Sequence, residues 1–293
     1  MMIEAMFLKA LDLTDKLATG VRGKVVVIDI PFGSSKNTQE DEKTYQETTR
    51  KFILALGERL VRWFDHHPHR HWDEFKNDAR FILKSKKQAP ACALLIRPEL
   101  VCEVDTIIAH DHFDGLISAA KYVLNGQDPY PGASHDAIVA ENRVGELSKK
   151  GNRFKAALRA EPVDNNMRQA IFRELISARR SALVDMAALK YGKIEFETLK
   201  LAQQYVLVGR VAIVYATEAD RFDLAMLLVI GQALAKVAIV KVVSQRSGNE
   251  VLKIAGSKEW DFVTMFDLAG GVPNRVTLPA ERMEEVLYKI NQG

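Results

Sequence analysis

Short apolar, β-branched runs alternate with helical patterns in the first half of the chain. The runs "GKVVVIDIPFGSS" (23–35), "LVRWFDHH" (60–67) and "CEVDTIIAHDHFDG" (102–115) predict buried strands. The run "LISAAKYVLNG" (116–126) predicts a helix that ends at a glycine. Strands that alternate with helices favour a parallel sheet, so the pattern predicts an α/β fold. In such sheets ligands bind beyond the carboxyl ends of the strands.

Acidic and imidazole side chains stand where these predicted strands end. They are Asp29, the run Asp65 to His67, and the run His110 to Asp114. Carboxylates can bridge two metal ions, and imidazoles suit manganese, iron, zinc or cobalt. This coincidence predicts a divalent metal centre that includes Asp29, His66, His110, His112 and Asp114.

The run "HDHFDG" has an informative spacing. His110, His112 and Asp114 alternate at a spacing of two, so on an extended strand end all three side chains point to the same side. Gly115 allows the chain to turn sharply, which lets the next helix begin close to the site. Other histidines are expected to be ordinary surface or core residues, namely His69, His71 and His135.

The same residues resemble the signature of the DHH phosphoesterase superfamily. "WFDHHPH" (63–69) is similar to the DHH motif, and "AHDHFDGLISAA" (109–120) resembles the motif H-x-D-x-D-G with its small-residue helix. "VVVIDIP" (25–31) resembles the strand that carries a bridging aspartate, and "AENRVGELSKKG" (140–151) resembles the fourth motif. "LAGGVPNRVTLP" (268–279) resembles the glycine-rich substrate loop of the C-terminal, DHHA1-like domain. The superfamily includes RecJ-like exonucleases, oligoribonucleases, cyclic-dinucleotide phosphodiesterases and manganese-dependent pyrophosphatases.

The sequence departs from this family pattern in three ways. The H-x-D-x-D-G-like motif follows the DHH motif instead of preceding it, as a circular permutation would produce. His112 stands where an aspartate is usual, which makes the site less negative and favours softer ions. The C-terminal loop lacks the usual glycine triplet with histidine. The substrate, or the way in which it is held, is therefore expected to differ.

The resemblance implies two divalent metal ions, with Mn²⁺ favoured and Co²⁺, Mg²⁺, Fe²⁺ or Zn²⁺ as alternatives. It makes Asp29 the bridging ligand. The other ligands that it implies are His110 and His112 at one ion, and Asp114, His66 and Glu141 at the other. It makes Asp65 an acid that orients His66 and places His67 at the substrate phosphate. Asp136 or Asp105 could take the place of Glu141.

The second half of the chain changes character. Charge-rich helical patterns from about residue 140 predict a connector, and "YVLVGRVAIVYATE" (205–218) begins a second strand-rich region. We expect a DHH-like metal domain with its helical connector at 1–185 and a smaller DHHA1-like substrate domain at 186–293, with the active site in the cleft between them. The loop residues expected to hold a second phosphate are Gly270, Gly271, Asn274 and Arg275. The alternative is an ordinary β-turn before the last strand.

Composition restricts the partners of the protein. The net charge is only +3, so a long nucleic-acid duplex is not expected as a partner. Two cysteines without CxxC spacing indicate a reducing, cytoplasmic location. Lysines interrupt the apolar run at 224–243, which argues against a membrane segment. The N-terminal stretch at 1–20 is expected to form an amphipathic helix instead of a signal peptide. The sequence allows a homodimer but does not predict one.

The predicted function is metal-dependent hydrolysis of small phosphoesters, such as short oligonucleotides or cyclic and linear dinucleotides. Two metal ions would activate a water molecule for attack on phosphorus, so no protein nucleophile is required. Ser118 is expected to pack against the sheet instead of attacking. One alternative is a nucleotide-binding or regulatory protein of the same descent without turnover. Another is a metal-binding or structural protein that has no phosphate site.

Overall fold

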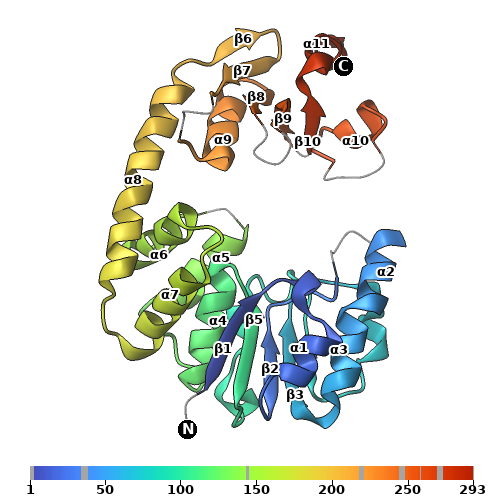
Figure 1. Ribbon diagram of the computed structural model, residues 1–293, viewed down its shortest axis with the longest axis vertical. Coiled ribbons are helices and arrows are strands. Elements are labelled where there is room, and N and C mark those ends of the chain that lie inside the picture. Colours follow the sequence, from blue (N-terminus) through green and yellow to red (C-terminus); the bar gives the residue numbers. More distant parts are fainter. Residues whose placement is uncertain are drawn as a thin grey trace. The chain divides into compact units, whose positions relative to one another are not determined.

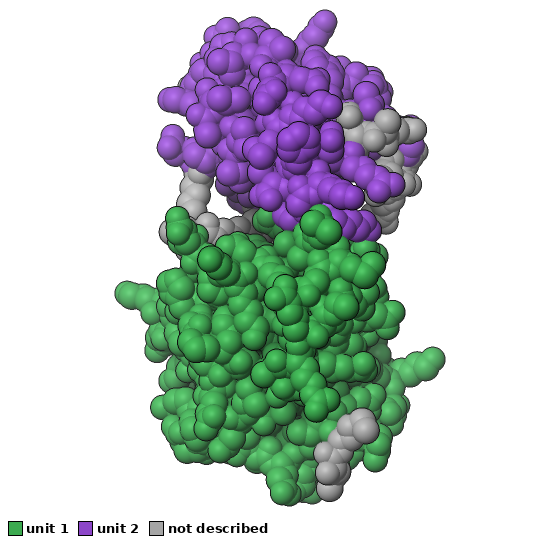
Figure 2. Space-filling view, turned by 90° about the vertical axis from the view of Figure 1, so that its left-hand side faces the viewer, with its two compact units in different colours: residues 1–189 green, residues 190–293 purple. Residues whose placement is uncertain are grey.

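The computed structural model describes residues 3–33, 39–142, 145–217, 221–243, 248–257, 259–268 and 273–292. The chain divides into two compact units, residues 1–189 and 190–293, which Figure 2 shows in different colours. Each unit contains its own five-stranded sheet and its own hydrophobic core. The predicted α/β fold class, with a parallel sheet in the first part and a second, smaller α/β part, is confirmed.

The first unit is built around a parallel sheet with the strand order β1-β5-β2-β3-β4 (Figure 1). Its strands are β1 (Glu4–Leu8), β2 (Val25–Ile28), β3 (Leu60–Asp65), β4 (Phe81–Leu83) and β5 (Thr106–His110). β5 is inserted between β1 and β2, although it is the last of the five in sequence. Ile28 lies opposite both Phe64 of β3 and Ala109 of β5. The residues that follow these three positions therefore meet at one edge of the sheet.

Helices cover both faces of this sheet. The helices of the first unit are α1 (Asp15–Gly20), α2 (Gln39–Glu47), α3 (Thr49–Leu56), α4 (Phe113–Val123), α5 (Ala133–Asn142), α6 (Lys149–Ala160) and α7 (Asn165–Ser177). On one face Phe52 of α3 packs with Trp63 and its strand neighbours. On the other face Phe64 contacts Tyr122 of α4, with ring centroids 6.0 Å apart. Burial on both faces explains why the central strands read as continuous apolar runs.

The N-terminal stretch differs from its expected structure. It was expected to form one amphipathic helix over 1–20, but residues 4–8 form β1 and only residues 15–20 form α1. β1 is an edge strand of the sheet and pairs with β5 along its whole length. Phe7 then packs on Phe172 of α7, with ring centroids 5.4 Å apart. Pairing with a distant strand therefore outweighs the local helical pattern.

Helix α8 (Ala182–Ala202) includes the residues at which the two units divide in sequence. The second unit has a mixed sheet with the strand order β10-β9-β8-β7-β6. Its strands are β6 (Val206–Val208), β7 (Val211–Tyr215), β8 (Val237–Val243), β9 (Glu250–Gly256) and β10 (Arg275–Pro279), and its helices are α9 (Leu224–Leu234), α10 (Phe262–Met265) and α11 (Met283–Gln292). Among the described strands of this sheet, β7 and β8 are the one pair that runs in parallel. The apolar run at 224–243 thus divides into a helix and a strand, and within the described ranges no helix is long and apolar enough to cross a membrane.

Candidate metal centre

The carboxyl ends of β2, β3 and β5 bring the predicted metal ligands of the first unit together. Asp29 directly follows β2, and its backbone N–H donates to the Phe64 carbonyl at 2.7 Å. Asp65 ends β3, so His66 and His67 project from the next strand of the sheet. His110 ends β5, on the other side of β2. The sheet order therefore places Asp29 between two groups of imidazoles.

The Asp29 carboxylate is the centre of this arrangement. Asp29 is fully buried, and its backbone has a φ of 64°, a left-handed conformation that aspartate tolerates better than most residues. Neither carboxylate oxygen has a hydrogen-bond partner among the described residues. A buried carboxylate without partners is costly, because ionised oxygens lose their hydration. The group therefore fits a site in which a cation supplies the missing interaction.

Three imidazoles surround this carboxylate. His66 Nε2 lies 3.2 Å from Asp29 Oδ1, His67 Nδ1 lies 3.9 Å from the same oxygen, and His110 Nδ1 lies 3.8 Å from Asp29 Oδ2. His66 Nδ1 also lies 2.9 Å from the Ala89 carbonyl, which fixes the proton on Nδ1. The lone pair on His66 Nε2 then faces Asp29, which is the orientation that a metal-binding histidine requires.

A second buried carboxylate completes the centre. Asp114 lies in the first turn of α4, is 2% exposed, and has an Oδ2 without a hydrogen-bond partner among the described residues. Ligand atoms of Asp29, His110 and Asp114 lie within 4.8 Å of one another, as do those of His66, Asp114 and Glu141. These two groups have the size and the donor types of a two-ion centre with carboxylate and imidazole ligands.

The structure distinguishes the three acids considered for the fourth motif. Glu141 Oε1 lies 4.0 Å from His66 Nε2 and 3.7 Å from His67 Nε2, and it pairs with Lys86. Asp136 instead accepts hydrogen bonds from the Tyr130 hydroxyl and from the backbone and side chain of Ser148. It thereby fixes the start of α6.

The third acid, Asp105, has a different role. Its carboxylate accepts the backbone N–H of Lys24 at 2.9 Å, near the start of β2. This is the opposite end of the strand from Asp29. Of the three candidates, Glu141 is the one that the structure brings to the metal centre.

Asp65 contacts a different histidine from the one expected. Its Oδ1 lies 2.8 Å from His67 Nδ1 and accepts the His67 backbone N–H at 3.1 Å. His66 is oriented by the Ala89 carbonyl instead. Asp65 therefore holds the orientation of His67.

His112 does not share the position of His110. β5 ends at His110 and α4 begins at Phe113, so the extended alternation expected for the run 110–114 stops before residue 112. The side chain of His112 is 63% exposed, and its Nε2 lies 3.5 Å from Asp111 Oδ1. It belongs to a group with His110 and Asp111, not to the groups that contain Asp29.

Two further residues belong to this region that the sequence did not single out. Asp111 is 8% exposed, and Lys86 pairs with Glu141 although it comes from the loop after β4. The run "HDHFD" could have pointed to Asp111, because a carboxylate between two histidines can itself be a metal ligand. No such signal marks Lys86, since only the fold brings residues 86 and 141 together.

The electrostatics of the site depend on burial. Burial raises the pKa of Asp29 to about 7, and it raises the pKa of Asp114 well above its usual range, with the neighbouring Asp29 charge adding to the shift. Burial, together with the charges of His112 and His67, lowers the pKa of His110 to about 3. Burial alone would also lower the pKa of His67, but its contacts with Asp65 and Glu141 outweigh burial and raise it to about 10. Without metal, burial thus favours the protonated forms of Asp29 and Asp114 and a neutral His110, whereas the contacts of Glu141 with His67 and Lys86 outweigh burial and lower the pKa of Glu141.

Metal affinity is therefore expected to depend on pH. Asp29 and Asp114 must both lose their protons to act as ligands, and burial raises the pKa of each, so the apparent affinity for Mn²⁺ is expected to fall at least about tenfold per pH unit below pH 7. His110 adds no proton competition in this range, because its pKa is about 3. Titration calorimetry in two buffers of different ionisation enthalpy, between pH 5.5 and 8, measures both the affinity and the protons released. An affinity that is constant across this range would contradict the assignment.

The predicted substrate loop is only partly described. Gly270 and Gly271 lie outside the described residues. The Asn274 side chain donates to the Gly256 carbonyl at 3.0 Å, and its own carbonyl accepts the Gly256 N–H at 3.0 Å. Asn274 therefore joins the end of β9 to the start of β10 across the sheet. Arg275 is the first residue of β10 and is exposed.

Comparisons with known proteins give a structural relative but no sequence relative. No protein-family model matches the sequence, and no curated protein matches it. The structure of a pGpG-specific phosphodiesterase, PggH, from Vibrio cholerae is 12% identical, over 79% of this chain and 78% of that chain, with a TM-score of 0.53. The two proteins share a fold. An exopolyphosphatase-related protein from Bacteroides fragilis is also 12% identical, over 95% of this chain and 72% of that chain, with a TM-score of 0.39.

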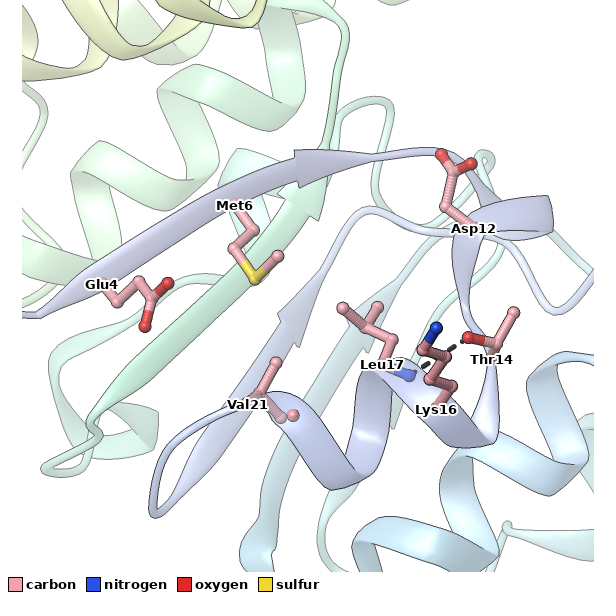
Figure 3. Close-up of a pocket in the computed structure, with 8 residues that line it drawn as sticks. Glu4, Met6, Asp12, Thr14, Lys16, Leu17 and Val21 are labelled. Atoms are coloured by element: carbon pink, nitrogen blue, oxygen red, sulfur yellow. Dashed lines mark hydrogen bonds between the residues drawn. The ribbon is translucent and has the colours of Figure 1, made fainter.

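A surface pocket lies away from the metal centre. It has a volume of about 460 Å³ and lies beside β1 and α1, where Met6, Leu17 and Val21 form its apolar part (Figure 3). None of the predicted ligands lines it. The centre shared by β2, β3 and β5 is defined by its unpaired buried polar atoms, not by this pocket.

Proposed function

We propose that this protein is a divalent-metal-dependent phosphoesterase that hydrolyses small phosphoesters. The observation that carries the proposal is the fully buried Asp29 carboxylate, which has no hydrogen-bond partner among the described residues and is surrounded by imidazoles and a second buried acid. Such a group is stable as an anion only beside a cation. A carboxylate that can bridge two ions at the end of a parallel strand suits a two-metal hydrolytic site.

The fold supports this class of reaction. The structural relative from Vibrio cholerae is named as a phosphodiesterase acting on pGpG. We propose membership of the DHH, RecJ-like superfamily, with the first-motif strand moved behind the DHH strand in sequence. The position of β5 beside β2 supports this arrangement. Short oligonucleotides and linear or cyclic dinucleotides are the proposed substrates, and Mn²⁺ is the proposed ion, because imidazole ligands suit it better than Mg²⁺.

The proposed roles follow the geometry. Asp29 would bridge the two ions, His110 would complete one site, and the remaining ligands of the other site would be His66, Asp114 and Glu141. When bound, the two ions would activate a water molecule and neutralise phosphate charge. His67 Nδ1 lies 2.8 Å from Asp65 Oδ1, and in the metal-free protein the contacts with Asp65 and Glu141 raise the pKa of His67 to about 10, so it carries a proton at neutral pH. It would donate a hydrogen bond to a phosphate oxygen, and Arg275 is the proposed cation for a second phosphate.

The test of this function is hydrolysis by metal-stripped protein. The substrates are an aryl phosphodiester, a linear dinucleotide and a cyclic dinucleotide, each with Mn²⁺, Co²⁺, Mg²⁺ or no metal. We expect Mn²⁺ to raise the rate at least about 100-fold for one of the nucleotides, which corresponds to about 3 kcal/mol of transition-state stabilisation. If nucleotide and metal bind but no ion restores turnover, the protein is a binding or regulatory protein instead.

A further inference from the structure

A third group of ligand atoms lies beside the proposed metal centre. His110, Asp111 and His112 place one atom each within 4.8 Å of one another. Asp111 Oδ1 lies 3.9 Å from His110 Nε2 and 3.5 Å from His112 Nε2. The edges of a tetrahedron of zinc ligands are about 3.4 Å, given Zn–N distances of roughly 2.1 Å. The three atoms therefore need little movement to hold a single ion.

The Asp111 carboxylate points to a ligand independently of this spacing. Its side chain is nine-tenths buried, and its Oδ1 has no hydrogen-bond partner among the described residues. Its other oxygen, Oδ2, lies 3.3 Å from Arg168 Nη2 and 3.8 Å from Lys9 Nζ. Arg168 Nε also donates to the Asp111 backbone carbonyl at 2.9 Å, so the residue is held in place from behind. This support orients Oδ1 toward the two imidazoles.

The two nitrogens of His110 face different groups. Nδ1 lies 3.8 Å from Asp29 Oδ2, inside the proposed centre, whereas Nε2 lies 3.9 Å from Asp111 Oδ1, outside it. A neutral imidazole has one nitrogen with a lone pair and one with a proton. If His110 Nε2 binds an ion, Nδ1 carries the proton and faces Asp29 as a hydrogen-bond donor. His110 then has no nitrogen lone pair available for the proposed metal centre. His112 is largely exposed, which gives ions in solution access to the outer group.

We propose that His110, Asp111 and His112 form a flanking site for zinc-like ions that competes with the main centre for His110. Two imidazoles and one carboxylate are a donor set that favours zinc or cobalt over manganese or magnesium. The neighbouring charges of Arg168 and Lys9 on Asp111 Oδ2 are expected to weaken the site, but Asp111 Oδ1 remains directed at the two imidazoles. The flanking site stands on its own geometry, but its consequence rests on the proposed function: zinc bound there would withdraw His110 from the manganese-supported reaction.

The test uses the full chain with the main centre disabled by Asp29→Asn. Metal-free Asp29→Asn protein is titrated with Zn²⁺ against a chelator of known affinity, and with Co²⁺, whose visible spectrum reports a tetrahedral site. We expect one ion to bind. Adding Asp111→Asn or His112→Gln should weaken that binding at least about 100-fold, because each removes a direct ligand. Adding His135→Gln, an exposed histidine in α5, should leave it unchanged.

The outcomes separate the flanking site from the proposed function. If Asp29→Asn protein binds no zinc, or if Asp111→Asn leaves the zinc affinity unchanged, the flanking site is refuted. Hydrolysis by the wild-type protein with Mn²⁺ would remain as support for the phosphoesterase. If the wild type shows no hydrolysis with any ion, while Asp111→Asn still abolishes zinc binding, the phosphoesterase is refuted and the flanking site stands.

Discussion

Replacing Asp29 by asparagine is expected to lower the Mn²⁺-supported rate of phosphoester hydrolysis by at least about 10³-fold, or roughly 4 kcal/mol. Asparagine has the shape of aspartate and accepts the left-handed φ of 64° at this position, so the backbone is expected to be retained. What is lost is the negative charge between His66 and His110, and with it the bridging ligand of the proposed centre.

The same substitution is expected to stabilise the metal-free protein. Burial raises the pKa of Asp29 from 3.8 to about 7 in the folded state, so the folded protein holds this proton more tightly than the unfolded chain. Ionisation of Asp29 therefore favours unfolding: its cost begins near pH 4, grows up to pH 7 and is constant above. Three pKa units correspond to about 4 kcal/mol. At pH 8, Asp29→Asn should therefore raise the free energy of unfolding by about 1–4 kcal/mol. The gain is smaller than the full cost of the buried charge, because the buried amide still lacks hydrogen-bond partners.

Urea unfolding of chelator-treated protein, at pH 8 and at pH 4, measures this effect, and the gain should disappear at the lower pH. The control is Asp136→Asn, another fully buried acid in the same unit. Asp136 accepts three hydrogen bonds, so its neutralisation should cost about 1–3 kcal/mol of stability. Equal loss of activity in both variants, per folded molecule, would show that Asp29 has no special role.

The sequence was sufficient to predict which acidic and imidazole residues of the first unit lie together at one edge of its sheet. β2, β3 and β5 are short apolar runs buried on both faces, and residues such as Asp29, His66 and His110 interrupt them at one end. A charged or polar group directly after a buried strand has to be stabilised locally, so it marks the ligand-binding edge of a parallel sheet. This reasoning needs only the chain direction and the pattern of burial.

The predicted alignment of His112 with His110 was wrong because it depends on the residue at which the strand ends and the helix begins. An extended chain would have aligned His110 with His112, but α4 begins at Phe113 and turns the chain before the alternation is complete. Asp111 thereby becomes the buried neighbour of His110, and His112 remains exposed. A shift of one residue at a strand end changes which side chains enter a site, and sequence patterns do not define such ends to one residue.

Contacts between segments that are distant in the chain could not be predicted from the sequence. Glu141 approaches His66 and Lys86 because α5 packs on α4 and on the segment that follows Ala91. The sequence favoured Glu141 but left Asp136 and Asp105 as alternatives. In the second unit, the sequence allowed Asn274 to lie in a phosphate loop or in a turn, but did not predict that its side chain donates to the Gly256 carbonyl across the sheet. A polar side chain has several local uses, and the three-dimensional neighbours decide among them.

Replacing Gly115 by alanine is expected to disrupt both the fold and the centre. A Cβ at this position would lie far inside van der Waals contact with the His110 carbonyl oxygen, and close to the His110 side chain. The clash is with backbone, so it cannot be relieved by rotation of a flexible side chain. Overpacking of this kind costs about 3 kcal/mol or more. Because the strained segment joins His110 to Asp114, a displacement of roughly 1 Å there should also lower the catalytic rate about 100-fold.

Gly192→Ala is the matched control, because Gly192 lies within α8 and has no atom within 4 Å of the position of an added Cβ. It should stabilise the protein by about 0.5–1 kcal/mol through helix propensity, so the two substitutions should have opposite signs. Denaturant unfolding and Mn²⁺ titration of both variants measure the two effects. If Gly115→Ala keeps wild-type stability and metal affinity, the turn between β5 and α4 does not set the position of His110 and Asp114. The tight approach of α4 to β5 would then have no role in building the centre.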